Sequence, residues 1–153
     1  MSKPRILLVR LTADGRLDID ESDEENKFDP QKQPYAIHWI LVGAKLRNAT
    51  FGKFASGEIG IKGQNGSRPW PFGPARVLND RVLVLQNDYH AGDPKGYWVY
   101  QLSVELGKLS FKTTFDPSLL KARSGKSRLS RADDDCCDTM MMRVTNNPII
   151  INR

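Results

Sequence analysis

GYWVYQLSVELGKLSFKTTF, residues 96–115, is the stretch of sequence that decides the fold. From Trp98 to Leu106 an apolar side chain recurs at every second position, which is the period of a strand with one buried face. Gly107 follows as a turn residue, and residues 109–115 repeat the alternation. We therefore predict a β-hairpin that presents one face to the core.

Several short runs on either side of this hairpin also have the composition of strands. Residues 35–42 (YAIHWILV) are apolar on both faces except at His38, which is typical of a buried central strand. Trp39 is the candidate for the largest core residue. Further strands are predicted at residues 5–11, at 16–20, at 81–86, and at 149–151 as a final edge strand.

The spacing of turn residues indicates the fold class. Glycine, proline, asparagine and aspartate interrupt every apolar run before three helical turns could form. We therefore expect an all-β protein with no helix longer than about ten residues. We predict a single domain over residues 1–153, an antiparallel β-sandwich or barrel with about six to eight strands.

Charge is concentrated in blocks along the chain, which carries a formal net charge of +5. Residues 18–29 are strongly acidic and residues 121–131 are strongly basic. Such blocks are more typical of solvated loops than of a binding face, so a nucleic-acid partner is not expected. Residues 121–138 contain almost no large apolar side chain, and we expect a long, charged, exposed loop near the C-terminus that is disordered in the free protein.

The sequence also bears on the compartment. The apolar run near the start, at Ile6 to Val9, is shorter than the apolar core of a secretory signal peptide. No other apolar stretch approaches the roughly 20 residues that cross a bilayer. The two cysteines, Cys136 and Cys137, are neighbours and cannot link distant parts of a fold. We expect a cytoplasmic protein with no membrane association.

Candidate metal and cofactor ligands are few. Copper would need two histidines and a cysteine at suitable positions, and His38, His90 and Cys136 lie on segments with no reason to converge. The glycines of residues 57–66 lack the spacing of a phosphate-binding loop. We therefore expect no metal site and no cofactor.

Aromatic residues in loops are the candidates for contact with a ligand or partner. Residues 63–74 (GQNGSRPWPFGP) surround Trp70 and Phe72 with turn residues. We therefore expect these two rings either to be buried in the core or to contact a ligand or partner. The other candidates are Tyr89, His90 and Tyr97. Just before this loop, glycines 52, 57 and 60 predict a turn into a short strand with Ile59 and Ile61 on one face.

Evidence for catalysis is weak. His90 has carboxylates nearby in the sequence, but a polar turn between two strands accounts for the same composition. No nucleophile motif accompanies it, and no residue is assigned a catalytic role.

Four short motifs resemble those of a class of small bacterial cupredoxin-like domains. They lie at residues 37–41 (IHWIL), 57–61 (GEIGI), 96–100 (GYWVY) and 147–152 (NPIIIN). The resemblance implies an antiparallel Greek-key β-sandwich of cupredoxin or immunoglobulin type, without the copper ligands of true cupredoxins. No functional residue can be carried over from it. This chain departs from the pattern by its long charged insertion after Asp116 and Pro117, and by Asn147 where the class usually has aspartate.

The leading hypothesis is a non-enzymatic interaction module that binds a protein partner or itself through sheet edges or loop aromatics. Two alternatives remain: a metal-binding or electron-transfer domain, and a small hydrolase that uses His90.

Residues 121–138 should be the first part of the chain that trypsin cuts. They contain five basic residues and only Leu129 as a large apolar anchor, and a protease needs an extended, locally unfolded segment. Limited digestion followed by intact mass measurement checks this. Early cleavage near residues 50–60 or 80–90, with 121–138 protected, would contradict the prediction.

Overall fold

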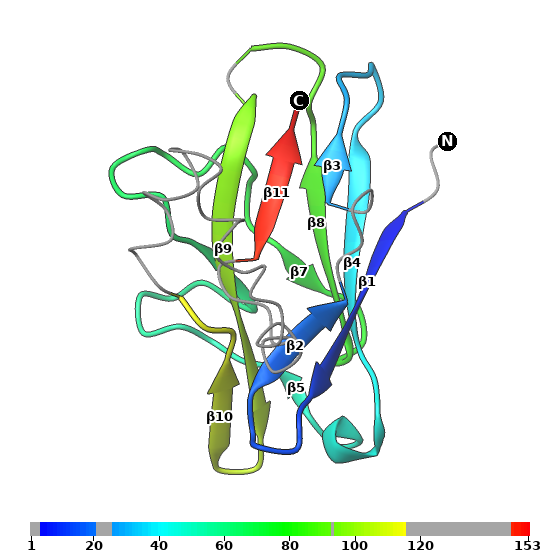
Figure 1. The fold of residues 1–153 in the computed structure, drawn as a ribbon, viewed down its shortest axis with the longest axis vertical. Coiled ribbons are helices and arrows are strands. Elements are labelled where there is room, and N and C mark those ends of the chain that lie inside the picture. Colours follow the sequence, from blue (N-terminus) through cyan, green and yellow to red (C-terminus); the bar gives the residue numbers. More distant parts are fainter. Residues whose placement is uncertain (1–3, 21–25, 93, 116–147) are drawn as a thin grey trace, which may run out of the picture.

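The computed structural model describes residues 4–20, 26–92, 94–115 and 148–153. Within these ranges the chain forms eleven β-strands and one short 3₁₀ turn at Ala44–Leu46, so the all-β prediction is confirmed (Figure 1). No helix in this part of the chain is long and apolar enough to cross a membrane. The predicted loop at residues 121–138 lies outside the described residues.

The first sheet has five strands in the order β2-β1-β4-β8-β7. These strands are β1 (Arg5–Leu11), β2 (Leu17–Asp20), β4 (Tyr35–Leu41), β7 (Arg76–Val77) and β8 (Val82–Asn87). β4 is the central strand, as its composition predicts. Every second residue of β4 is buried, beginning with Tyr35, and the residues between them are half-buried on the opposite face.

The second sheet contains the strands β10-β9-β11-β3 in that order, and β5 and β6 also pair with β9. These strands are β3 (Lys27–Phe28), β5 (Thr50–Phe51), β6 (Ile61–Gly63), β9 (Gly96–Leu106), β10 (Leu109–Lys112) and β11 (Ile149–Asn152). The predicted hairpin is confirmed, with Leu109 opposite Leu106 and Gly107 in the turn at φ 62°.

Three predicted details of the sheets are wrong. β1 is parallel to β4, and β3 is parallel to β11, so both sheets are mixed rather than antiparallel. β11 lies between β9 and β3 and is not an edge strand. The strand count exceeds the expected six to eight because β3, β5 and β7 are only two residues long, and such short strands leave no periodic pattern in a sequence.

The parallel pairing of β1 with β4 follows from the route of the chain. After β1 the chain reverses into β2, then contributes β3 to the other sheet, and enters β4 in the same direction as β1. A parallel pair needs such a crossover connection, whereas a two-residue hairpin produces only antiparallel pairs.

Trp39 joins the two sheets at the centre of the core, and its predicted role as the largest core residue is confirmed. It projects from β4 of the first sheet and is fully buried. Its indole N–H donates a hydrogen bond of 3.0 Å to the hydroxyl of Tyr100, which lies on β9 of the second sheet. The two rings are also in edge-to-face contact, with centroids 5.4 Å apart. Side chains from both sheets therefore share one core.

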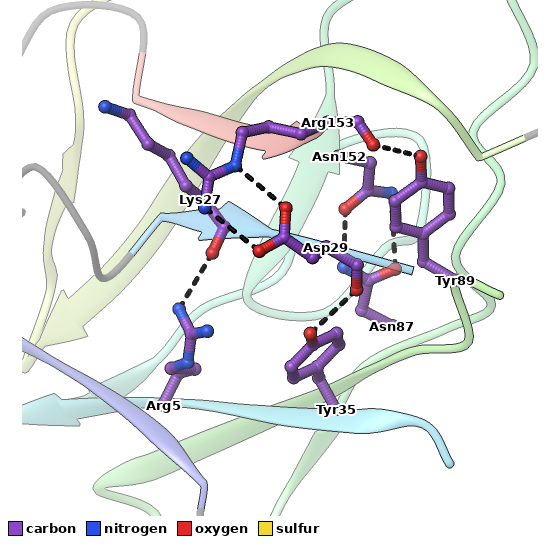
Figure 2. A network of polar contacts seen from close by, with 8 residues as sticks. All are labelled: Arg5, Lys27, Asp29, Tyr35, Asn87, Tyr89, Asn152 and Arg153. Atoms are coloured by element: carbon purple, nitrogen blue, oxygen red, sulfur yellow. Dashed lines mark hydrogen bonds and ion pairs between the residues drawn. The ribbon is translucent and has the colours of Figure 1, made fainter. Parts of the chain in front are cut away.

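Figure 2 shows the polar contacts that hold the last strand in place. Asn87 and Asn152 are both buried and exchange hydrogen bonds between their side-chain amides, at 2.8 and 3.3 Å. Asn152 also donates to the carbonyl of Pro94 at 2.6 Å. The hydroxyl of Tyr89 donates to the carbonyl of Arg153. Because buried amides must be hydrogen-bonded, these contacts specify one position for β11.

A second group of contacts in Figure 2 holds β3. The guanidinium of Arg5 donates to the carbonyl of Lys27 at 2.9 Å and lies 4.6 Å from the centre of the Phe28 ring. Asp29 follows this strand, and its carboxylate pairs with Arg153 at 3.1 Å. The hydroxyl of Tyr35 donates to the carbonyl of Asp29 at 2.7 Å. β3 is thereby bound to β1, to β4 and to the end of β11.

Replacing Tyr100 by phenylalanine should lower the free energy of unfolding by about 1–3 kcal/mol, because the buried indole N–H of Trp39 then loses its acceptor. Tyr97→Phe is the matched control, since Tyr97 lies on the same strand with 52% of its surface exposed. That variant should stay within about 0.5 kcal/mol of the wild type. Urea unfolding of both variants measures the difference, and an equal loss in the two would contradict the role given to this bond.

Candidate functional site

A cleft of about 500 Å³ opens beside β6, between this strand and the loop that contains Trp70. Its walls are mostly apolar and include Ile59, Ile61, Trp70 and Pro74. Charged groups come from three further lining residues, Glu58, Lys62 and Arg68. An open apolar hollow with a few polar groups is the usual form of a binding site in proteins.

Trp70 is positioned by contacts on two sides. One edge of its ring lies directly on the backbone of Gly63, where an added Cβ would come within 2.3 Å of Cε3. Phe72 meets the indole edge to face at 4.8 Å, and Phe72 in turn contacts the ring of Trp98 at 6.0 Å. Phe72 is only 2% exposed, so it anchors the loop in the core and leaves Trp70 half-buried at the surface.

Arg68 attaches the same loop to the start of β9. Its guanidinium carbon lies 3.6 Å from the centre of the Trp98 ring, a stacking geometry that favours a cation over an aromatic face. It also donates to the carbonyls of Tyr97 and Lys95, at 2.9 and 3.3 Å. Gly96 permits this approach, because a Cβ there would lie 3.1 Å from the guanidinium.

A second hollow, of about 340 Å³, adjoins the first. Its lining residues are Arg68, Pro69, Trp70, Pro71 and Trp98. Arg68 and Trp70 line both hollows, so an extended ligand could contact both at once.

The pKa of Glu58 is lowered from its usual value. The hydroxyl of Ser56 donates a hydrogen bond to its carboxylate and lowers the pKa of Glu58, and the positive charge of Lys62 acts in the same direction. The cleft therefore contains one carboxylate opposed by the cations of Lys62 and Arg68, which can orient a polar or charged segment of a ligand.

β6 is an edge strand along the cleft. Ser103 donates to the carbonyl of Gly60, and Gln64 donates to the carbonyl of Val99, both at 2.9 Å. Backbone groups alternate in direction along a strand, so those of Ile61 and Gly63 point away from β9. Both residues also line the cleft. Among the strands that the structure describes, only β9 pairs with β6.

Ile59 is the cleft residue that the sequence placed incorrectly. It was expected to share a face with Ile61, but Ile59 is 48% exposed and Ile61 is 4% exposed. The cause is Gly60, whose φ of 81° breaks the extended backbone between them. The sequence pattern also does not identify the charged residues of the cleft, such as Lys62, as site residues. The only local indication of an unusual backbone there is the group of glycines around them.

The five residues predicted to contact a partner lie in different environments. Trp70 lines the cleft, and the carbonyl of Tyr97 binds Arg68 near it. Phe72 and Tyr89 are each 2% exposed and form part of the core. His90 is exposed just beyond the end of β8 and does not line either hollow. Contact with a partner stays a prediction, for which Trp70 and Tyr97 offer the accessible surface.

The described residues contain no cluster of three histidine, cysteine, aspartate or glutamate side chains that could hold a metal ion. His38 lies on the half-buried, outward side of β4. Cys136 and Cys137 lie outside the described ranges.

Comparisons with protein-family models, with curated proteins and with solved structures produced no match.

Gly63→Ala should displace Trp70 and reshape the cleft, because the added methyl group would overlap the indole ring. We expect a loss of about 1–3 kcal/mol in the free energy of unfolding, as for other overpacked sites, and a shift in tryptophan fluorescence. Gly73→Ala is the control, since no atom lies within 4 Å of an added Cβ there. Unchanged fluorescence and stability in Gly63→Ala would contradict this packing.

Proposed function

We propose that this protein is a non-enzymatic interaction module that binds an extended segment of a protein partner in the cleft beside β6. The observation that carries the proposal is the combination of an edge strand and an apolar cleft at one place, with Ile61 and Gly63 belonging to both. A sheet edge offers main-chain hydrogen bonds to any extended peptide, and adjacent pockets select among side chains.

The mode of binding follows from this arrangement. The partner segment adds as a further strand and exchanges hydrogen bonds with the outward backbone groups of Ile61 and Gly63. Its alternate side chains enter the two hollows that Trp70 lines. Ile59 supplies exposed apolar area at the mouth, and Lys62 and Arg68 attract a carboxylate of the partner.

The Greek-key order of the sandwich and the cupredoxin-like class belong to the same proposal. The two sheets with a common core around Trp39 support the sandwich architecture that both require. In this class of fold, sheet edges and loops are the parts available for partner binding.

Peptides selected from a random phage-displayed library against the full chain should bind at this cleft. We expect Ile59→Asp to weaken their binding at least roughly tenfold, since a charge replaces apolar contact area. Leu109→Asp is the matched control, because Leu109 is 59% exposed on β10 and does not line the cleft. Fluorescence anisotropy with a labelled peptide measures both affinities.

N-methylation of successive peptide amides provides a second readout. Only every second amide of an added strand faces β6, so methylation should weaken binding at alternate positions. If no peptide is enriched, if Ile59→Asp binds as tightly as Leu109→Asp, or if methylation has no alternating effect, the proposal is wrong.

A further inference from the structure

The outer face of the first sheet, the face opposite the Trp39 core, carries aliphatic side chains among polar ones. The apolar side chains alternate with the core residues of β1, β4 and β8, or follow β7; they are Ile6, Leu8, Ala36, Ile40, Val82, Val84 and Leu78. The polar side chains of this face are Arg10, Asp18, Asp20, His38, Arg76 and Gln86. Ile6 is 44% exposed and Leu78 is 50% exposed. An apolar patch of this kind on a soluble domain is typical of an interface.

Two opposite charges lie at the two edges of the outer face. Asp20 is on β2, in register with Leu8, and Arg76 is on β7, in register with Val84. Both are exposed, and neither forms an ion pair with any residue that the structure describes. The edge strands are four strand spacings apart, about 19 Å, which is too far for the two side chains to meet within one molecule.

We propose that the outer face is a self-association surface through which two copies of this chain pack face to face. A twofold axis parallel to the strands and passing over β4 places β2 of one copy on β7 of the other. Asp20 then lies about one pair of residues, roughly 7 Å, along the strands from Arg76 of the second copy, within reach of the long arginine side chain. The contact occurs twice because of the symmetry.

The charges also select this orientation over the alternative. A twofold axis in the plane of the sheet but perpendicular to the strands would place β2 on β2 of the second copy, and would bring the two Asp20 carboxylates toward each other. Like charges across an interface oppose association. His38 and Ile40 of the central strand lie near the preferred axis and meet their own counterparts there.

The available area suits a small interface of the kind found in weak dimers. The 26 residues in the strands of the first sheet, at about 4.8 Å by 3.3 Å each, define a footprint of roughly 410 Å² before side-chain relief is counted. Stable protein interfaces bury about 800 Å² per partner when accessible area is measured. The outer face is on a different sheet from the β6 cleft, so this inference does not depend on the proposed peptide binding.

Sedimentation equilibrium of the full chain across the micromolar range tests the proposal. We expect a monomer–dimer equilibrium in the wild type. Asp20→Arg alone and Arg76→Asp alone should each weaken dimerisation roughly tenfold, because each places like charges together twice. The double variant restores the pairing with reversed signs and should return to within about twofold of the wild type. This recovery separates a contact between copies from a loss of folding.

Ile6→Asp should weaken the dimer at least roughly 100-fold, since it buries an unpaired charge in the interface. Leu109→Asp and Ile59→Asp, on the other sheet and at the cleft, should dimerise as the wild type does. The proposal is overturned if the wild type stays monomeric throughout, if the single charge changes have no effect, if the double variant fails to recover, or if Ile6→Asp dimerises normally.

Discussion

The hydrogen bond from the indole of Trp39 to the hydroxyl of Tyr100 joins the centres of the two sheets. A fully buried indole needs an acceptor, and here the acceptor comes from the opposite sheet, so the bond specifies how β4 and β9 lie across the core. β4 carries β1 and β8 on its two edges, while β9 carries β5, β6, β10 and β11. Most of the remaining structure is therefore positioned by these two strands.

The cleft is a consequence of how β9 anchors its neighbours. β6 pairs with one edge of this strand, and Arg68 binds backbone carbonyls at its beginning. Phe72 attaches the other end of the loop to Trp98. Between these attachments Trp70 can neither enter the core nor move freely into solvent, because Gly63 and Phe72 hold its ring on two sides. The result is a half-buried aromatic ring beside an open strand edge.

The two proposed surfaces differ in the physical reason for their exposure. The cleft is exposed because a turn at Gly60 directs Ile59 outward while Ile61 stays buried. The outer face is exposed because it is the side of the first sheet opposite the shared core. One surface offers hydrogen bonds and pockets to an extended segment, and the other offers a broad flat area to a similar surface.

The spacing of turn residues alone determined the all-β class, and period-two alternation determined the hairpin of β9 and β10. The continuous apolar run at residues 35–42 determined the central position of β4 with Trp39 in the core. Such patterns assign side chains to faces, but they do not identify the neighbouring strand. The parallel pairs, the interior position of β11 and the cleft around Trp70 depend on contacts between residues far apart in sequence, such as Asn87 with Asn152 and Arg68 with Tyr97. Only the tertiary structure could decide them, because close approach of distant segments leaves no local period.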